Sequence, residues 1–449
     1  MENVGLHAVV RAPECVVLPG DASWDEARLA WNLAVDQRPE AVALPASVDE
    51  LSEVVRWAAA EGYRVAPQGT GHMAASLGDL EGAVLVKLSG LRGVTVDPER
   101  RVARAAAGAI WIEVVEAAAE HGLAALSGSS PDVGVVGYTL GGGLSWLARK
   151  HGIGANNVEA IELVTADGEH RRVDAEHEPD LFWALRGGGG AFGVVTAIEL
   201  SLFPYESVYA GHLWFPVERA AEVLRAWRDW TETVPEEMTS VGRVLQFPPI
   251  PEIPEPMRGN SYAVLQAIWC GGDVDEANRL LEPLRALGPA LDTFAQLPMP
   301  ALSQLHMDPD HPVPGHGDGQ MLDALTDDAI DAFVETVVGK PILGAEIRHL
   351  GGAVARVRPG HGAAAAFAAP YITFAVGIAP TPEAHVAVAQ AVTAFIGGLE
   401  PWSATHTYLN FAESGRDPRN LWSETALVRL RRVKERYDPE NLIRSSHEL

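Results

Sequence analysis

Apolar residues in the first 205 positions follow helix and strand periods in turn. Ser47-Val-Asp-Glu50 is a capping box, and the apolar residues behind it recur at three- and four-residue spacing, which predicts a helix ending at Gly62. Apolar, mostly β-branched runs predict strands at 64–67, 84–88, 94–96, 102–105, 161–166 and 194–200, and helical periods span 110–121 and 180–186. Together these elements predict a mixed α/β half that ends near Pro204.

The pattern changes from about Tyr205. Helical segments at 217–230 and 274–287 flank apolar strands such as 261–269, and a basic amphipathic helix is predicted at 424–437. The apolar runs of this part alternate and lack the even strand–helix spacing of a parallel sheet, so we expect an antiparallel sheet backed by helices. Residues 298–319 are rich in Pro, Gly, Asp and His, which predicts a long loop without regular structure over a pocket.

Three glycine clusters lie beside strand-like runs in the first half. They are Gly69-Thr-Gly-His72, Leu140-Gly-Gly-Gly143 and Gly187 to Gly193. Glycine lets the backbone approach a ligand closely, so three such turns indicate a large, flat ligand, and a nucleotide cofactor fits better than a sugar or a metal. Gly188-x-Gly190-x-x-Gly193 matches the Rossmann fingerprint literally, but it follows a helix and precedes a strand, the reverse of the order that a Rossmann site requires.

Composition narrows the classes of partner. At 449 residues the chain exceeds the roughly 250–300 at which single cores stop growing, which predicts two domains. The 34 Lys and Arg residues against 60 Asp and Glu residues give a net charge of −26, which argues against nucleic-acid and anionic-membrane partners. The first residues, MENVGLH, carry no secretory pattern, no run approaches a membrane span, and two cysteines suit a reducing compartment, so we expect a cytoplasmic protein.

Several individual side chains are candidates for a functional site, and the sequence supports some of them better than others. His72 sits between a strand and a glycine turn, where it can reach the edge of a cofactor. Tyr408 and Asn410 fall on one face of an alternating run that predicts a strand. A metal site in the 298–319 loop is disfavoured because prolines interrupt it and no two of its histidines have helical spacing; the residues weighed for it are His306, Asp308, Asp310, His311, His316 and Asp318.

Taken in order, several segments resemble the berberine bridge enzyme-like branch of the vanillyl-alcohol oxidase/p-cresol methylhydroxylase (PCMH-type) flavoproteins. The segments are Pro19-Gly20-Asp21, Trp31-Asn32, Arg38-Pro39, Gly71-His72, Val133-Gly134-Val135, Thr139 to Gly143, Gly187 to Thr196, Tyr408-Leu-Asn410 and Tyr437-Asp-Pro-Glu-Asn-Leu442. The resemblance covers nearly the whole chain. It implies an α+β fold with an FAD-binding module of two α/β lobes and a substrate domain with an antiparallel sheet backed by helices.

The resemblance also implies three parts. They are an FAD-binding PCMH-type domain at 1–205, a substrate-binding domain at 206–404, and a C-terminal segment at 405–449 that returns to the FAD domain. We expect FAD to contact Pro67, Gly69, Thr70, Gly71, His72, Met73, Ser76, Ser130, Pro131, Val133, Gly134, Gly137, Gly141, Gly142, Gly143, Ser145, Asn157, Gly190, Gly193, Val195, Tyr408 and Asn410. Backbone N–H groups of the His72 turn and of residues 141–145 are expected to bind the pyrophosphate.

The position of His72 matches the histidine that bonds covalently to the flavin ring in this family. Many members add a second link through cysteine in a Cys-Pro-x-Val-Gly segment, which here reads Ser130-Pro131-Asp132-Val133-Gly134. A single histidyl link and no cysteinyl link are therefore implied. Thr70, Val136 and Ser145 depart from the family pattern, which commonly has glycine at these places.

The implied activity is that of an FAD-dependent oxidase acting on an alcohol or amine carbon of a small organic molecule, with O2 as the final acceptor and hydrogen peroxide as product. Tyr408 is the expected catalytic base, and Val135 lies where small residues leave oxygen a path. Two alternatives remain open: a dehydrogenase using another acceptor, and a flavin-containing binding protein without turnover. The sequence does not identify the substrate or the oligomeric state.

Overall fold

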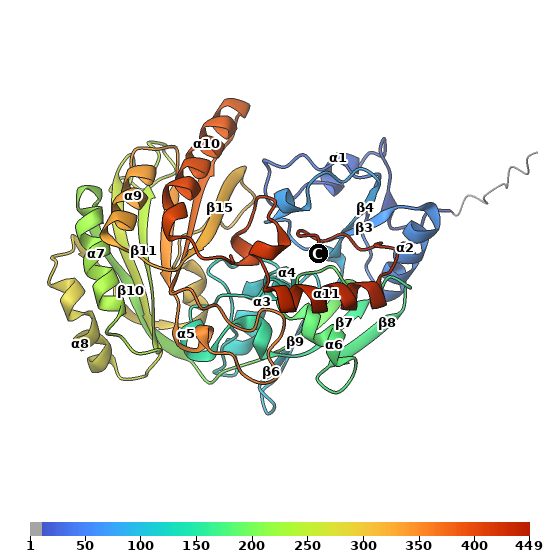
Figure 1. Ribbon diagram of the computed structural model, residues 1–449, viewed down its shortest axis with the longest axis horizontal. Coiled ribbons are helices and arrows are strands. Elements are labelled where there is room, and N and C mark those ends of the chain that lie inside the picture. The colour runs from blue at the N-terminus through green and yellow to red at the C-terminus, as the bar shows by residue number, and fades with distance from the viewer. Residues whose placement is uncertain (1–10) are drawn as a thin grey trace, which may run out of the picture.

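A small, mostly parallel sheet organises the N-terminal part of the computed structural model, which describes residues 11–449 (Figure 1). Its strand order is β1 (Val16–Val17), β2 (Ala41–Ala43), β4 (Ala83–Lys87), β3 (Arg64–Gln68), and only the β1–β2 pair is antiparallel. Helix α2 (Val48–Glu61) begins at Ser47, whose side chain accepts the N–H of Glu50, and ends at Gly62 in the left-handed region at φ 77°. The N-cap at Ser47 and the glycine stop predicted from the sequence are confirmed. The return bond of the predicted capping box goes one residue further, because the carboxylate of Glu50 accepts the N–H of Ala46 instead of that of Ser47.

A second, antiparallel sheet completes this half of the molecule. Its strand order is β5 (Val94–Asp97), β6 (Val102–Ala106), β9 (Val194–Ser201), β7 (Val158–Val164), β8 (His170–Asp174). The helices between these strands are α3 (Trp111–Ala119), α4 (Val135–Leu140), α5 (Ala148–His151) and α6 (Pro179–Leu185). Helix α1 (Trp24–Ala27) lies earlier in the chain, between β1 and β2.

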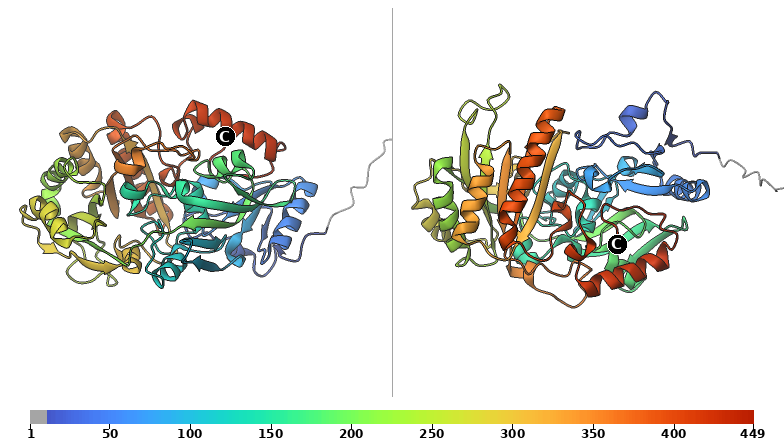
Figure 2. Two further views of the ribbon diagram at one scale, coloured as in Figure 1. Left: turned by 90° about the horizontal axis from the view of Figure 1, so that it is seen from below. Right: turned by 45° about the horizontal axis from the view of Figure 1, so that its top comes forward.

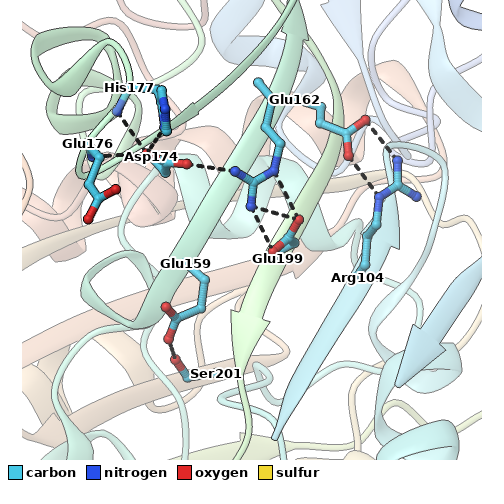
Figure 3. Close-up of polar contacts among 9 residues, drawn as sticks. Arg104, Glu159, Glu162, Asp174, Glu176, His177, Glu199 and Ser201 are labelled. Carbon is cyan, nitrogen blue, oxygen red and sulfur yellow. Dashed lines mark hydrogen bonds and ion pairs between the residues drawn. The ribbon is translucent and has the colours of Figure 1, made fainter. Parts of the chain in front are cut away.

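Paired charges join the strands of this second sheet (Figure 3). Arg104 on β6 donates two hydrogen bonds of 2.9 Å to Glu162 on β7, and Arg172 on β8 binds Glu199 on β9. Each such pair at a partly exposed surface contributes at most about 1 kcal/mol. Each pair reaches across one intervening strand, β9 for the first and β7 for the second, and adds little to stability.

The middle of the chain forms one antiparallel sheet of eight strands. Along it lie β13 (Leu291–Asp292), β10 (Ser207–Pro216), β12 (Ser261–Trp269), β11 (Met238–Gln246), β16 (Gly344–His349), β17 (Tyr371–Ile378) and β15 (Gly315–Leu322), with β14 (Ala295–Pro298) paired to β10. Four helices cover its outer face (Figure 1): α7 (Ala220–Thr231), α8 (Val274–Arg285), α9 (Asp327–Val337) and α10 (Pro382–Leu399). The antiparallel sheet backed by helices is confirmed, and with it the α+β class.

The C-terminal segment lies against the N-terminal half, as both views in Figure 2 show. Helix α11 (Glu424–Tyr437) has the bounds that its amphipathic period predicts and contacts α6. Beyond it, Ile443 forms a parallel bridge with Val65, and the N–H of Arg444 donates to the carbonyl of Val65 at 2.8 Å. The last residues of the chain thus extend the small sheet that carries the His72 turn.

Two local predictions are wrong. Residues 298–319 do contain regular structure, because a 3₁₀ helix spans Met299–Gln304 and β15 begins at Gly315. Tyr408 and Asn410 do not lie on a strand: a 3₁₀ helix at Leu409–Phe411 turns the chain there.

Two further expectations concern the membrane and the first residues. Between residues 11 and 449, no helix is long and apolar enough to cross a membrane. The expectation about a secretory signal concerns MENVGLH, which lies outside the described residues.

Candidate functional site

A cavity of about 400 Å³ lies between the glycine turns and the large sheet. One wall carries His72, Met73 and Gly134, and Tyr408 comes from the C-terminal segment. The opposite wall consists of side chains from β11, β16 and β17, among them Arg243 and Phe374. The cavity therefore joins segments from all three parts of the chain that the sequence distinguishes.

A second cavity of about 150 Å³ adjoins the first and shares Gly69, Gly134 and Gly137 with it. Glycines of the third cluster, Gly189 to Gly193, form its far wall together with Arg444 and His447. A Cβ added at Gly69 or Gly137 would meet no atom within 4 Å, so side chains there would project into open space. Among residues 11–449, no Asp or Glu lines this cavity although the chain has a net charge of −26, so the cavity suits an anionic ligand.

His72 is held on the cavity wall by three neighbours. Its ring stacks on Trp31 with centroids 4.0 Å apart, and its Nδ1 lies 2.7 Å from the hydroxyl oxygen of Thr70. Its Nε2 lies 3.5 Å from a carboxylate oxygen of Asp132. Gly71 has φ 89°, and a Cβ there would come within 2.9 Å of Ala30, so this turn requires glycine.

Tyr408 is buried, with 1% of its surface exposed. Its hydroxyl oxygen accepts the N–H groups of Gly143 and Leu144 at 3.0 Å and the amide of Asn410 at 2.8 Å. Burial raises the pKa of Tyr408 above its ordinary value, whereas the N–H donors and the nearby Arg348 oppose that rise. The structure thus brings Tyr408 and Asn410 together as the sequence predicts, through a 3₁₀ turn rather than a strand.

A buried charge cluster forms the wall facing Tyr408. The Nε–H of Arg348 donates to Glu346 at 2.7 Å, and Nε2 of His306 lies 2.6 Å from the other carboxylate oxygen. Burial alone would raise the pKa of Glu346, but Arg348 and His306 hold it well below its usual range. Arg243 donates to the carbonyl of His306 at 2.6 Å, and Asp308 accepts the hydroxyl of Ser130. These charges are fixed features of the cavity wall.

Glu413 is the acid in this cavity with a strongly raised pKa. It lines the cavity close to Asp318, which is paired with Arg416 at 2.8 Å. Burial, and then repulsion by Asp318, raise the pKa of Glu413 to about 8. Its carboxyl group is therefore protonated at neutral pH and can donate a hydrogen bond into the cavity.

The raised pKa of Glu413 predicts a pH-dependent stability. Because the folded chain holds a proton that the unfolded chain releases near pH 4.5, this stabilisation is complete below that pH and is lost as pH rises through 8. Glu413→Gln keeps the shape of the neutral carboxyl group. At pH 9 we therefore expect its free energy of unfolding to exceed that of the wild type by roughly 2 kcal/mol, after allowance for screening by water in the cavity, and its unfolding temperature to be higher. Thermal unfolding from pH 5 to 9 measures this; equal pH slopes for both proteins would contradict it.

The structure brings most of the predicted cofactor residues to the two cavities. The residues that line one or both are Pro67, Gly69, Thr70, Gly71, His72, Met73, Ser130, Val133, Gly134, Gly137, Gly141, Gly190, Gly193, Val195, Tyr408 and Asn410. Six others line neither: Ser76, Pro131, Gly142, Gly143, Ser145 and Asn157. Their observed contacts are internal, such as the amide of Asn157 donating to the carbonyls of His151 and Ile153.

The prediction that backbone N–H groups of residues 141–145 bind the pyrophosphate is wrong for residues 141 to 144. The N–H groups of residues 141 to 144 do not point to a ligand, because each donates within the protein: Gly141 to Gly137, Gly142 to Thr139, and the next two to Tyr408. They cannot also bind a pyrophosphate. A Cβ at Gly141 would lie 1.7 Å from the amide oxygen of Asn410, so glycine is needed there for packing against the C-terminal segment.

Sequence reasoning missed much of the far wall. Arg243, Glu346, Arg348 and Phe374 fall in ordinary strand patterns that give no sign of a site. Sequence reasoning also missed four residues near the C-terminal end that line the smaller cavity and begin two positions after the Tyr437-to-Leu442 segment: Arg444, Ser445, Ser446 and His447. His306 and Asp308 were considered only as metal ligands; in residues 11–449 no group of three or more potential ligands is arranged around a metal position.

Comparison with known proteins relates this part of the chain to FAD-binding proteins. Residues 39–174 match the family described as FAD binding domain. The chain is 33% identical over 188 residues to (R)-6-hydroxynicotine oxidase from Paenarthrobacter nicotinovorans, which covers 42% of this chain and 41% of that protein. It is 28% identical over 468 residues to xylooligosaccharide oxidase from Thermothelomyces thermophilus, covering 95% and 90%.

Solved structures share the whole fold. BBE-like 1 from Physcomitrella patens superposes with a TM-score of 0.83 at 21% identity, over 95% of each chain. A 6-hydroxy-D-nicotine oxidase from Arthrobacter nicotinovorans superposes with a TM-score of 0.82 at 22% identity, over 95% of this chain and 96% of that one. The two-lobed N-terminal half and the large antiparallel sheet are thus a known arrangement.

The two cavities fit FAD. The smaller one offers open glycine backbone, the guanidinium of Arg444 and no carboxylate, which suits a pyrophosphate. The larger one offers flat apolar surface near His72, with the polar edge of Tyr408 and Asn410. Since they share residues 67–69, one elongated ligand could occupy both.

Proposed function

We propose that this chain is an FAD-linked oxidoreductase of the berberine bridge enzyme-like, PCMH-type flavoproteins, and that it is an oxidase that takes hydride from an alcohol or amine carbon of a small organic molecule. Dioxygen would re-oxidise the flavin, with hydrogen peroxide as product. The observation that carries this proposal is that His72, Tyr408 and the buried charges of the large sheet all line one cavity. A binding protein without turnover would not need that arrangement.

FAD supplies the hydride acceptor, and the protein supplies binding, orientation and electrostatics. We assign the smaller cavity to the adenosine and pyrophosphate part, where Arg444 offsets the phosphate charge. We assign the cavity beside His72 to the flavin ring, with His72 as its single covalent link. Ser130, at the place of the second link in the family pattern, donates its hydroxyl hydrogen to Asp308. In the described part of the chain, Met73 is the one sulfur-containing residue that lines either cavity.

Tyr408 is the proposed proton acceptor. A phenol must lose its proton to act as a base, and burial opposes this by raising its pKa. The three N–H donors on its oxygen and the charge of Arg348 would stabilise the phenolate. These contacts support its role as a base. A phenolate needs a neighbouring cation or hydrogen-bond donors, and the sequence alone does not reveal them.

The choice of oxidase over dehydrogenase rests on the relatives rather than on Val135. Two relatives that match this chain are named oxidases, one of a sugar oligomer and one of a nicotine derivative. Val135 is fully buried at the start of α4 and lines neither cavity, whereas its neighbour Gly134 lines both. A dehydrogenase that passes electrons to another acceptor is the alternative. A cytoplasmic location stays a prediction.

The proposed reaction is tested by mixing the purified protein with a panel of sugars, alcohols and amines and following the flavin absorbance and peroxide. We expect at least one substrate to bleach the flavin without air and to give equimolar peroxide in air. The reduced protein should then recover its absorbance within seconds in air-saturated buffer. Recovery over minutes would exclude the oxidase, and a panel that never bleaches the flavin would favour a binding protein.

A further inference from the structure

Asp132 faces the side of His72 away from Thr70. Its Oδ1 and the Nε2 of His72 are 3.5 Å apart, and both atoms are buried without any other hydrogen-bond partner. A buried polar atom without a partner costs about 1–3 kcal/mol, so two such atoms facing each other form one interaction rather than two defects. The pairing predicts that the imidazole carries its proton on Nε2 and directs it to the carboxylate.

Other contacts fix this geometry. The indole N–H of Trp31 donates to the second carboxylate oxygen of Asp132, and the indole ring stacks on the His72 imidazole at an angle of 17°. The two side chains retain only 21% and 17% exposure. Trp31 therefore positions both members of the pair at once, and the imidazole ring cannot turn over without losing the stack.

We propose that Asp132 is the positioning residue that makes His72 competent to bond to the flavin, an inference that rests on the covalent link proposed above. By accepting the proton of Nε2, Asp132 leaves the lone pair on Nδ1, the nitrogen on the Thr70 side. The carboxylate also stabilises the positive charge that the imidazole acquires as the bond forms.

The atoms and electrons of the attachment balance with dioxygen as the oxidant. One bond forms between Nδ1 and the methyl carbon of the flavin ring, one C–H bond of that methyl group breaks, and the Nε2–H bond breaks. The two protons and two electrons released pass to dioxygen and give one hydrogen peroxide. Asp132 is the first acceptor of the Nε2 proton.

Thr70 is expected to slow the attachment of flavin to His72, whereas Asp132 is expected to speed it. Its hydroxyl lies 2.7 Å from Nδ1, and with the proton on Nε2 this hydroxyl must donate to the lone pair that forms the bond. It has to rotate away before attachment. Removing the hydroxyl should therefore speed attachment, whereas removing the carboxylate should slow it, and a purely structural role of either residue would not give opposite signs.

The test follows the covalent share of bound flavin in protein purified at set times after induction, by acid precipitation and intact mass. We expect Asp132→Ala to bind FAD but to attach it about 10²-fold more slowly than the wild type. Asp132→Asn keeps an acceptor for Trp31 and should also be slow, and Thr70→Val should be faster than the wild type at early times. Asp310→Asn, which removes an exposed carboxylate paired only with His311, is the matched control and should behave as the wild type.

Each other outcome overturns the inference in a distinguishable way. Attachment at the wild-type rate in both Asp132 variants would exclude the positioning role while leaving the His72 link intact. Loss of all bound flavin in both variants would show that Asp132 serves cofactor binding instead. A wild-type protein whose FAD is entirely non-covalent would remove the link and this inference together, while its turnover would still test the oxidase proposal separately.

Discussion

Replacing His72 with alanine is expected to leave no flavin attached to the denatured chain. In the folded variant, FAD should still bind through the open glycine wall and Arg444, because neither depends on the imidazole. Acid precipitation should then give a colourless pellet and a yellow supernatant. Activity should fall without disappearing, since Tyr408 and the charges of the large sheet are unchanged.

Two cysteine variants are the controls for this result. Cys15 and Cys270 are free and line neither cavity, so Cys15→Ser and Cys270→Ser should keep their flavin attached. Retention of acid-stable flavin in His72→Ala would show that another residue carries the link. Ser130→Ala removes only the hydroxyl that donates to Asp308, so this variant is expected to keep its flavin attached, as the two cysteine variants do.

Tyr408→Phe is expected to lower turnover by about 10²–10⁴-fold, the usual contribution of a positioned acid or base. KM should change much less, because the ring stays in place against Phe367 and Phe411. The N–H groups of Gly143 and Leu144 would lose their acceptor, so the variant should also be less stable by about 1–3 kcal/mol. Steady-state kinetics together with thermal unfolding separate the two effects.

A phenol outside the cavity is the control for Tyr408. Tyr209 on β10 donates its hydroxyl hydrogen to Asn278 and lines neither cavity, so Tyr209→Phe should keep full turnover. If Tyr408→Phe oxidises substrate at the wild-type rate with normal flavin content, Tyr408 is not the base. The buried carboxylates and His306 of the facing wall would then be the groups to substitute next.

The sequence predicted elements wherever a long run kept one period. Helix α11 and strand β12 have the predicted bounds. Helix α11 has one apolar face that packs against the core, and β12 is an apolar run whose residues 263–269 are all buried. Strand β15 was missed because it contains Gly317 and Gly319. A Cβ at these positions would come within 2.6 Å of the Phe374 ring and 3.0 Å of Phe411, so packing rather than turn formation selects glycine there.

The residues of the candidate site also fall into a group that the sequence predicts and a group that it does not. The His72 turn and the pair Tyr408 and Asn410 are compact motifs that a resemblance can place. Arg243 and Glu346 are more than 100 positions apart and meet only because β11 and β16 pair with these two residues opposite each other. Such contacts follow from strand register, which the chain reveals only after folding.

The claim on which the account rests is that one FAD is bonded to His72 in this cavity. The mass of the denatured wild-type chain, measured on a yellow preparation, tests it most directly. We expect the mass of the polypeptide plus one FAD, less the two hydrogens lost in forming the bond, with the addition mapped to the peptide that contains His72. A denatured chain with the mass of the bare polypeptide, and all of the flavin free in solution, would contradict it.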